Sequence, residues 1–112
     1  MWAKDGNGAG CNSGAIAAWE ASGAYCEGLT FSTYSDWRMP NVRELQSIVD
    51  YNTAFPAINT TYFTNTKGDY YWSSTTHSED TAYVWHVSFF DGLVYYNPPA
   101  NLFYVRCVRA GP

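Results

Sequence analysis

Apolar residues recur at helical spacing in the first quarter of the chain, over residues 14–27. The positions that carry this pattern lie three or four residues apart: Ile16, Trp19, Gly23 and Cys26. Such spacing is typical of one face of an amphipathic helix. Asn12 or Ser13 can cap its start, and Gly28 is placed to end it. A first helix over residues 14–27 is therefore expected.

A second helical pattern follows Pro40, which stops any regular element that precedes it. Asn41 is expected to be the N-cap, and Glu44, three residues later, completes a capping box. The apolar stripe of this helix consists of Val42, Leu45, Ile48 and Val49. We expect the helix to end near Tyr51 and to be followed by a long polar loop.

From Tyr70 onward the pattern changes to a period of two, which is the spacing of half-buried strands. Four strands are expected, over residues 70–74, 83–90, 93–97 and 103–109. Between the second and third of them, an Asp-Gly pair is the strongest hairpin signal in the chain and predicts a two-residue type I′ turn. Two helices followed by an antiparallel meander predict an α+β fold.

The predicted turn decides which side chains of the hairpin share a face. If residue 90 pairs with residue 93, the alternation of the strands separates two sets. One set is apolar and is expected to face the core: Trp85, Val87, Phe89, Val94 and Tyr96. The other is mixed and is expected to face outward: His86, Ser88, Phe90, Leu93, Tyr95 and Asn97. Mixed aromatic and polar surfaces are typical of recognition sites; the alternative is that this set covers a second small core or a subunit interface.

Composition narrows the class of protein. The 112 residues suffice for one domain, and 46% of them are hydrophobic and 19% aromatic. The net charge is −4 and Lys and Arg form no basic stripe, so we expect neither nucleic acid nor an anionic membrane as a partner. No stretch is long and apolar enough to span a membrane, and no apolar segment of a signal peptide follows the start.

The three cysteines, Cys11, Cys26 and Cys107, are far apart in the sequence. Because no CxxC pair occurs and His77 and His86 lie far from the cysteines, a zinc site is not expected. One long-range disulfide with a spare thiol would suit an exported or virion-surface protein; the alternative is three reduced, buried thiols. The chain contains no G-x-S-x-G, H-E-x-x-H or P-loop motif, and we predict that it is not an enzyme and needs no cofactor.

Three blocks of sequence resemble a known family. They are DWRMPNVREL at residues 36–45, YYWSST at residues 70–75 and YVRCVR at residues 104–109. With the two helical patterns, they resemble the family named for the C-terminal domain of the Legionella collagen-like adhesin, over residues 1–111. The resemblance implies a C-type-lectin-like fold, in which two helices pack on a twisted, mostly antiparallel sheet. It also implies a binding module of a bacterial or phage surface; the adhesin itself is trimeric and binds sulfated polysaccharide.

The resemblance also pairs Cys26 with Cys107 in a disulfide and leaves Cys11 as a free or intermolecular thiol. Two departures from the family limit what else it implies. A sulfated ligand is not expected, because the net charge of −4 leaves no basic surface for it. The Glu-Pro-Asn, Gln-Pro-Asp and Trp-Asn-Asp motifs of calcium-dependent lectins are missing, and the acidic residues near the hairpin match no calcium loop, so no metal is expected.

We therefore predict a single binding domain over residues 1–112 that lies outside the cell or on a virion surface and recognises a protein or a glycan. The expected ligand-binding residues lie on the outward hairpin face and in the adjoining loops: His77, Glu79, Asp80, His86, Ser88, Phe90, Asp91, Leu93, Tyr95, Asn97, Asn101 and Phe103. The competing function is a structural domain whose exposed aromatics form a homo-oligomer, with a homo-trimer as one expected form.

The stretch 86–103 has an unusual composition, since it lacks Lys, Glu, Gln, Met and Trp. The family resemblance gives this a meaning, because some lectin-like domains of the family are diversified by retroelements that randomise adenines in Asn-type codons. The residue types of this stretch fit such a product, which would make it a variable, target-specific surface on a fixed scaffold. The alternative is that a short stretch has this composition by chance.

Overall fold

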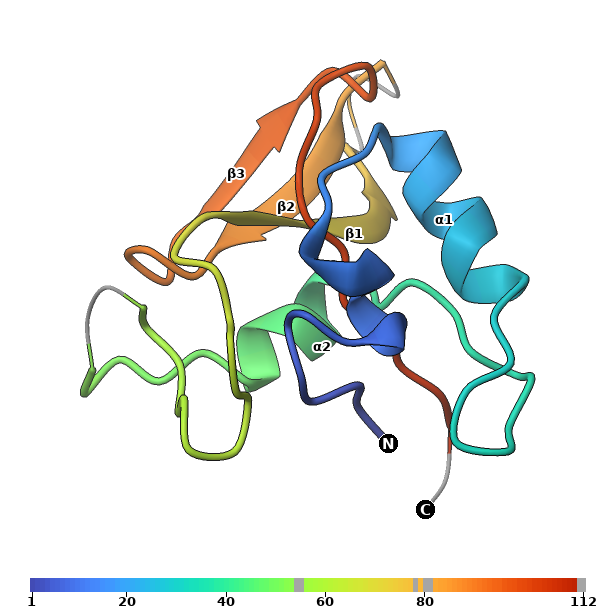
Figure 1. Ribbon diagram of the computed structural model, residues 1–112. Helices are drawn as coiled ribbons and strands as arrows, with labels where there is room; N and C mark the ends of the chain where they lie inside the picture. Colours follow the sequence, from blue (N-terminus) through green and yellow to red (C-terminus); the bar gives the residue numbers. More distant parts are fainter. Residues whose placement is uncertain (54–55, 78, 80–81, 111–112) are drawn as a thin grey trace.

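The computed structural model describes residues 1–53, 56–77, 79 and 82–110 of the chain. Its elements follow one another as η1 (Ala9–Gly14, a 3-10 helix), α1 (Trp19–Glu27), α2 (Val42–Ser47), β1 (Tyr70–Thr76), β2 (Val84–Ser88) and β3 (Val94–Asn97). The three strands form an antiparallel sheet in the order β1-β2-β3. The α+β class predicted from the sequence is confirmed (Figure 1).

The strands β1 and β2 carry a buried cluster on each of their two faces. Successive side chains of a strand point to opposite faces, and Trp72 and Val84 belong to one cluster while Tyr71 and Val87 belong to the other. α1 contributes to the first cluster and α2 to the second, so the helices cover different faces of the sheet (Figure 1). The centre of the sheet is therefore buried from both sides.

The first helix begins later than the helical spacing predicts, at Trp19. Asn12 and Ser13 both have a φ of 53°, so they form part of η1 and do not cap α1. The chain then runs extended, because the amide and the carbonyl of Ala17 are both hydrogen-bonded to the last segment of the chain (2.9 and 3.1 Å). As a result Ile16 lies on the surface, 49% exposed, and not on the buried face of a helix.

The second helix begins as predicted. The Asn41 side chain accepts a hydrogen bond from the Glu44 amide, and Glu44 Oε1 accepts one from the Asn41 amide (2.9 Å each). Arg38 donates two further hydrogen bonds to the same carboxylate (2.7 Å each), and these lower the pKa of Glu44. The helix ends at Ser47, earlier than predicted, because the chain turns back and the Asp50 amide bonds to a carbonyl of the following loop (2.9 Å).

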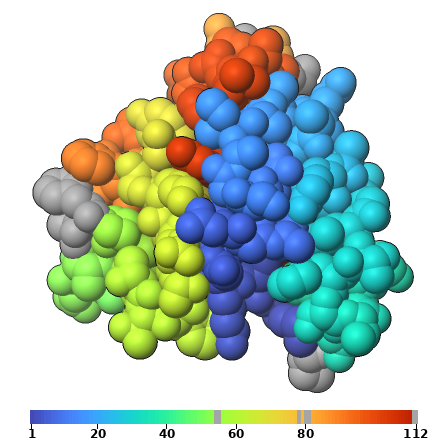
Figure 2. All heavy atoms as spheres, viewed as in Figure 1, coloured from blue at the N-terminus to red at the C-terminus, as the bar shows by residue number. Residues whose placement is uncertain are grey.

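Arg106 is fully buried and fastens the N-terminal segment to the loop before β1. Its guanidinium donates hydrogen bonds to the carbonyls of Ala3 and Lys4 (2.6 and 2.9 Å) and to Thr66 Oγ1 (2.7 Å). The guanidinium also lies over the ring of Tyr71, 5.5 Å from its centroid. Figure 2 shows the two fastened segments side by side, the N-terminal residues in blue and the loop in yellow.

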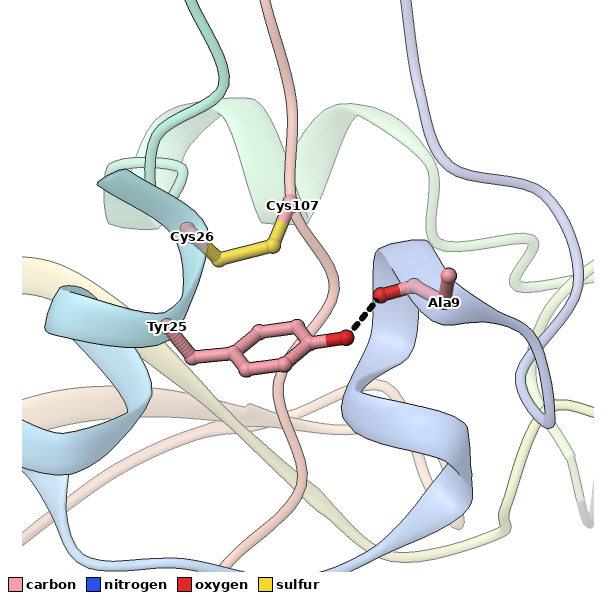
Figure 3. The surroundings of a disulfide bond; sticks show 4 residues. All are labelled: Ala9, Tyr25, Cys26 and Cys107. Carbon is pink, nitrogen blue, oxygen red and sulfur yellow. Dashed lines mark hydrogen bonds between the residues drawn. A yellow bond between two sulfur atoms is a disulfide. The ribbon is translucent and has the colours of Figure 1, made fainter. Parts of the chain in front are cut away.

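A disulfide joins Cys26 of α1 to Cys107 near the end of the chain, as the family resemblance implies (Figure 3). Beside it, the Tyr25 hydroxyl donates a hydrogen bond to the carbonyl of Ala9, which ties α1 to η1. Cys11 is buried and is not part of a disulfide. The end of the chain is thus held, together with α1 and η1, around one core.

The end of the chain does not form the continuous strand predicted over residues 103–109. It crosses the fold and makes single β-bridges with different segments: Ala17↔Phe103, Tyr71↔Tyr104, Trp2↔Val108 and Arg38↔Val108. Because these partners come from separate parts of the chain, none of the described segments runs beside it long enough to form a ladder. The DWR block belongs to this arrangement, since Asp36 forms an ion pair with Arg109 (2.6 Å).

Candidate functional site

The β2–β3 hairpin carries most of the predicted ligand-binding residues, and its register differs from the predicted one. His86 pairs with Tyr95, whereas a two-residue turn would pair it with Asn97. Residues 89–92 form the turn, because the Ser88 amide donates a hydrogen bond to the Leu93 carbonyl (2.9 Å). The shift is by two residues, so each strand side chain still lies on the face that the alternation predicts.

Phe89 explains the longer turn. Its amide donates a hydrogen bond to the Asp69 carbonyl (2.9 Å), and its carbonyl accepts one from the Ala57 amide (2.6 Å). Neither backbone group is then available to β3. The Phe89 ring is fully buried and packs edge-on against Tyr71, with the ring centroids 5.2 Å apart. Because of these contacts, the pairing of β2 with β3 ends before the predicted two-residue turn.

Gly92 and Asp91 order the tip of the hairpin. Gly92 has a φ of +79°, and a Cβ at this position would lie 2.9 Å from Val49 Cγ1, so glycine is required here. Asp91 accepts hydrogen bonds from the Leu93 amide (3.0 Å) and from the Tyr95 hydroxyl (2.7 Å). Desolvation raises the pKa of Asp91, but these hydrogen bonds outweigh it and hold the pKa below its usual value. The tip is therefore ordered and carries a negative charge.

Large apolar side chains are exposed around this tip. Phe90 and Leu93 are 50% and 53% exposed. Tyr51 is 69% exposed and donates a hydrogen bond to the Gly92 carbonyl (3.3 Å) from a position 41 residues earlier in the chain. The predicted site included Phe90 and Leu93 but not Tyr51, because nothing in the local sequence of that loop indicates contact with the hairpin.

The predicted outward position of His86 and Ser88 is wrong. Both are buried, at 0% and 2% exposure, and the rings of Tyr70 and Phe103 pack on His86. His86 Nε2 lies 2.5 Å from Asn97 Oδ1, so the neutral imidazole carries its proton on Nε2 and donates it to that oxygen. Nδ1 has no hydrogen-bond partner among the described residues. Burial lowers the pKa of His86.

The opposite face of the hairpin carries an aromatic cluster, called here the Tyr96 cluster. Tyr96 and its cross-strand partner Trp85 have ring centroids 5.1 Å apart. His77 stacks on Trp85 (5.0 Å, 22° between planes), and Tyr83 contacts Tyr96 (5.7 Å). Tyr96 is 50% exposed and the other three are partly buried, whereas the sequence pattern assigned Trp85 and Tyr96 to the core. Alternation did not reveal this, since both faces of the hairpin carry aromatic residues.

The remaining predicted site residues are Glu79, which donates a backbone hydrogen bond to His77 Nδ1 (3.2 Å), Asp80 and Asn101. Glu79 and Asn101 are exposed, whereas Asp80 lies outside the described residues. The predicted set as a whole is divided among the hairpin tip, the buried side of β2 and the Tyr96 cluster. Its assignment to ligand binding stays a prediction.

The accessible groups of the site are suited to contact with a ligand, and the buried thiol is not one of them. Burial raises the pKa of the Cys11 thiol to about 11, so it is protonated and unreactive at neutral pH. Across the residues that the structure covers, no three His, Cys, Asp or Glu side chains are grouped to hold a metal ion. The accessible groups of the hairpin are aromatic rings, aliphatic side chains, one carboxylate and amide or hydroxyl groups.

The fold is thus a small α+β domain closed by a disulfide, with an ordered, aromatic-rich hairpin. The chain belongs to the family of the Lcl C-terminal domain, whose model matches residues 1–109. Domains of this family occur in adhesin-like proteins. No curated protein matches the chain.

The disulfide indicates an extracytoplasmic domain, since such bonds persist in oxidising compartments. Among the helices of the described ranges, none has the length and apolar character needed to cross a membrane.

Proposed function

We propose that this domain is a non-enzymatic ligand-binding module of the adhesin or receptor-binding type, which recognises a protein or a glycan through the β2–β3 hairpin and its adjoining loops. The observation that carries the proposal is the exposure of Phe90 and Leu93, each about half exposed at the tip of a hairpin that is otherwise well packed. Exposed large apolar side chains gathered on one element are typical of an interaction site.

The rigidity of the scaffold supports this proposal. β2 is buried on both faces, and the tip is held by the hydrogen bonds of Asp91 and by the close approach of Gly92 to Val49. The contact side chains therefore project from a backbone that needs little ordering when a ligand binds. Such pre-organisation lowers the entropic cost of association.

The position of β3 adds a second kind of contact. Among the described residues, β3 pairs with β2 and is the edge of the sheet. A partner strand can add to an edge of this kind through backbone hydrogen bonds. Because β3 has only four residues, such an edge would supplement the side-chain contacts and not replace them.

Charge limits the ligand class. Residues 86–103 contain the carboxylate of Asp91 and no Lys or Arg. A sulfated polysaccharide needs cationic partners, so it is not the ligand that we propose. Neutral glycans and the apolar or weakly cationic surfaces of proteins fit the aromatic and hydroxyl groups that are present. Aromatic side chains supply most of the energy in many such interfaces.

The second candidate function is a structural domain that forms a homo-oligomer. It is favoured by the same exposed pair, Phe90 and Leu93, since a symmetric contact would bury two copies of an apolar patch. The two functions differ in what covers the patch. A second copy covers it in one case, and it stays open for a foreign ligand in the other.

The double variant Phe90→Ser with Leu93→Ser tests both functions. The probes are a glycan array and a displayed library of cell-surface proteins. We expect the variant to lose the signals that the wild type gives, with an almost unchanged melting temperature, because both side chains are exposed. Tyr62→Ser, at an equally exposed position on the loop before β1, is the control and should keep the signals. If light scattering shows an oligomer that the double variant dissolves into monomers, the structural function replaces the binding one.

A further inference from the structure

An open groove lies between α1 and the segment that leads into α2, away from the hairpin tip. It encloses about 460 Å³, which is within the usual range of ligand sites. Its lining includes Trp19, Gly23 and Met39, with Glu20, Glu27 and Arg38 around them. None of its lining residues is among those that the sequence pattern assigns to ligand binding.

The floor of the groove is apolar, and Gly23 keeps it open. A Cβ at Gly23 would meet only Met39 Cε within 4 Å, at an ordinary contact distance of 3.6 Å. Met39 is almost fully buried and Trp19 is partly buried. The indole of Trp19 is fixed, because its Nε1 donates a hydrogen bond to the Ser73 carbonyl (2.9 Å). A rigid apolar surface with room above the helix backbone is therefore present.

The rim of the groove has an excess of negative charge. Glu20 and Glu27 are both exposed on α1, and neither forms a salt bridge within the part of the chain that the structure describes. They are seven residues apart on the same helix face, so their backbones are separated by about 10 Å. The cation at the rim, Arg38, is engaged by two hydrogen bonds to Glu44.

A second, smaller hollow of about 260 Å³ lies beside this groove. It is lined by Ala18, Pro99 and Ala100, and Glu20 lines both hollows. The Trp19 amide bonds to the Pro99 carbonyl (3.0 Å), which holds the second hollow against the start of α1. The two hollows therefore adjoin at Glu20 near the start of α1, and together they are called here the α1 channel.

We propose that this channel binds a short cationic peptide segment of a partner protein, with an apolar side chain over Gly23 and Lys or Arg side chains at Glu20 and Glu27. The occupant follows from complementarity to the groove: the apolar floor suits an apolar side chain, and the two carboxylates, which form no salt bridge among the described residues, attract cationic ones. A second copy of this chain is a poor occupant, because each copy carries a net charge of −4. The site lies apart from the hairpin tip and does not depend on the proposed function, although Pro99 and Ala100 belong to the loop that follows β3.

A peptide titration tests the proposal directly. The probe is acetyl-Gly-Lys-Leu-Leu-Lys-Gly-amide, and the matched control probe carries Glu at both Lys positions. We expect amide NMR signals of α1 and the Trp19 indole signal to shift on titration, with saturation at a Kd below about 1 mM. The Glu peptide should cause no shifts, and added salt should weaken the binding of the Lys peptide. Absence of saturable shifts, or shifts confined to the hairpin, would overturn the proposal.

Variants of the channel supply the second test. Gly23→Leu fills the floor and should weaken binding of the Lys peptide at least tenfold while the amide spectrum stays that of a folded protein. Glu20→Gln and Glu27→Gln should each weaken it about two- to fivefold, as expected for exposed ion pairs. Asp69→Asn removes the same charge from an exposed position elsewhere and should leave the Kd unchanged. An unchanged Kd in both Glu20→Gln and Gly23→Leu would refute the site.

The hairpin double variant Phe90→Ser with Leu93→Ser separates this proposal from the previous one. It should bind the Lys peptide as the wild type does, because neither residue lines the channel. Loss of peptide binding in that variant would place the peptide on the hairpin and would contradict the channel.

Discussion

The Phe89 amide and the Asp69 carbonyl are joined by a hydrogen bond of 2.9 Å, and this bond separates two consecutive phenylalanines into different environments. Phe89 is fully buried against Tyr71, whereas Phe90 is half exposed at the turn. The Phe89 ring packs the hairpin against the rest of the fold, and the Phe90 ring is exposed to solvent. The pair therefore provides an internal comparison of core and surface.

Phe89→Ala should lower the free energy of unfolding by about 3–5 kcal/mol, because it removes a buried ring and leaves a cavity. Phe90→Ala should change it by no more than about 0.5 kcal/mol. Urea denaturation of the two variants, monitored by tryptophan fluorescence, measures both values. Equal losses in the two variants would show that the turn places both rings in the core.

Gly92→Ala should destabilise the domain by about 1–2 kcal/mol from its left-handed backbone alone, and by more once the contact with Val49 is included. Gly23→Ala is the matched control. Its added Cβ makes only an ordinary contact, and alanine favours the helix by about 0.5–1 kcal/mol, so this variant should be stabilised. Thermal melts of both variants show directly whether each substitution raises or lowers the melting temperature. A stabilised Gly92→Ala variant would contradict the turn geometry.

Arg106→Ala should be among the most damaging substitutions. It leaves the carbonyls of Ala3 and Lys4 and the Thr66 hydroxyl without their donor, and each unsatisfied buried group costs about 1–3 kcal/mol. Arg43→Ala removes the same charge from an exposed position of α2 and should stay within about 0.5 kcal/mol of the wild type. Circular dichroism during chemical denaturation distinguishes the two, and a mild effect of Arg106→Ala would mean that water replaces the guanidinium.

Stability should decrease as the pH falls below about 6.5, and His86 should be the cause. Burial lowers the folded-state pKa of His86, although the hydrogen bond to Asn97 and the charge of Asp69 act in the opposite direction. Above the unfolded pKa of about 6.5 both states hold neutral His86. Below it the unfolded chain takes up a proton that the folded protein resists, so the free energy of unfolding drops.

Unfolding at pH 7.5 and pH 5.5 measures this effect, since carboxylates titrate mostly below this window. His86→Gln should reduce the difference between the two pH values, whereas His77→Gln, at a partly buried position on the opposite face, should preserve it. A pH dependence that survives in His86→Gln would assign the proton uptake to another group.

Reduction of the Cys26–Cys107 disulfide should lower the free energy of unfolding by about 4–5 kcal/mol in the chain-entropy model, because the bridge spans 81 residues of sequence.

Cys11 should react with iodoacetamide only when the protein unfolds, because its thiol is buried and its pKa is raised to about 11. Mass spectrometry of the native and the urea-unfolded protein counts the labels. Rapid labelling of the native protein would show that Cys11 is accessible.

Local interactions are the part of this protein that could be read from its sequence. The capping box of Asn41 and Glu44 joins residues three positions apart, so the start of α2 follows from the chain itself. The alternation in the second half also predicted antiparallel strands and the α+β class correctly. The disulfide partners required the family resemblance, since spacing alone left other possibilities open.

Long-range contacts decided the rest. The turn begins at Phe89 because Asp69 and Ala57 take its backbone groups, and His86 is buried because Phe103 packs on it from the end of the chain. Hydrophobic alternation predicts a single buried face, but this sheet is covered on both sides by helices and by segments distant in sequence. Which aromatic side chains remained exposed was therefore settled by tertiary packing, because their burial depends on partners that no local pattern specifies.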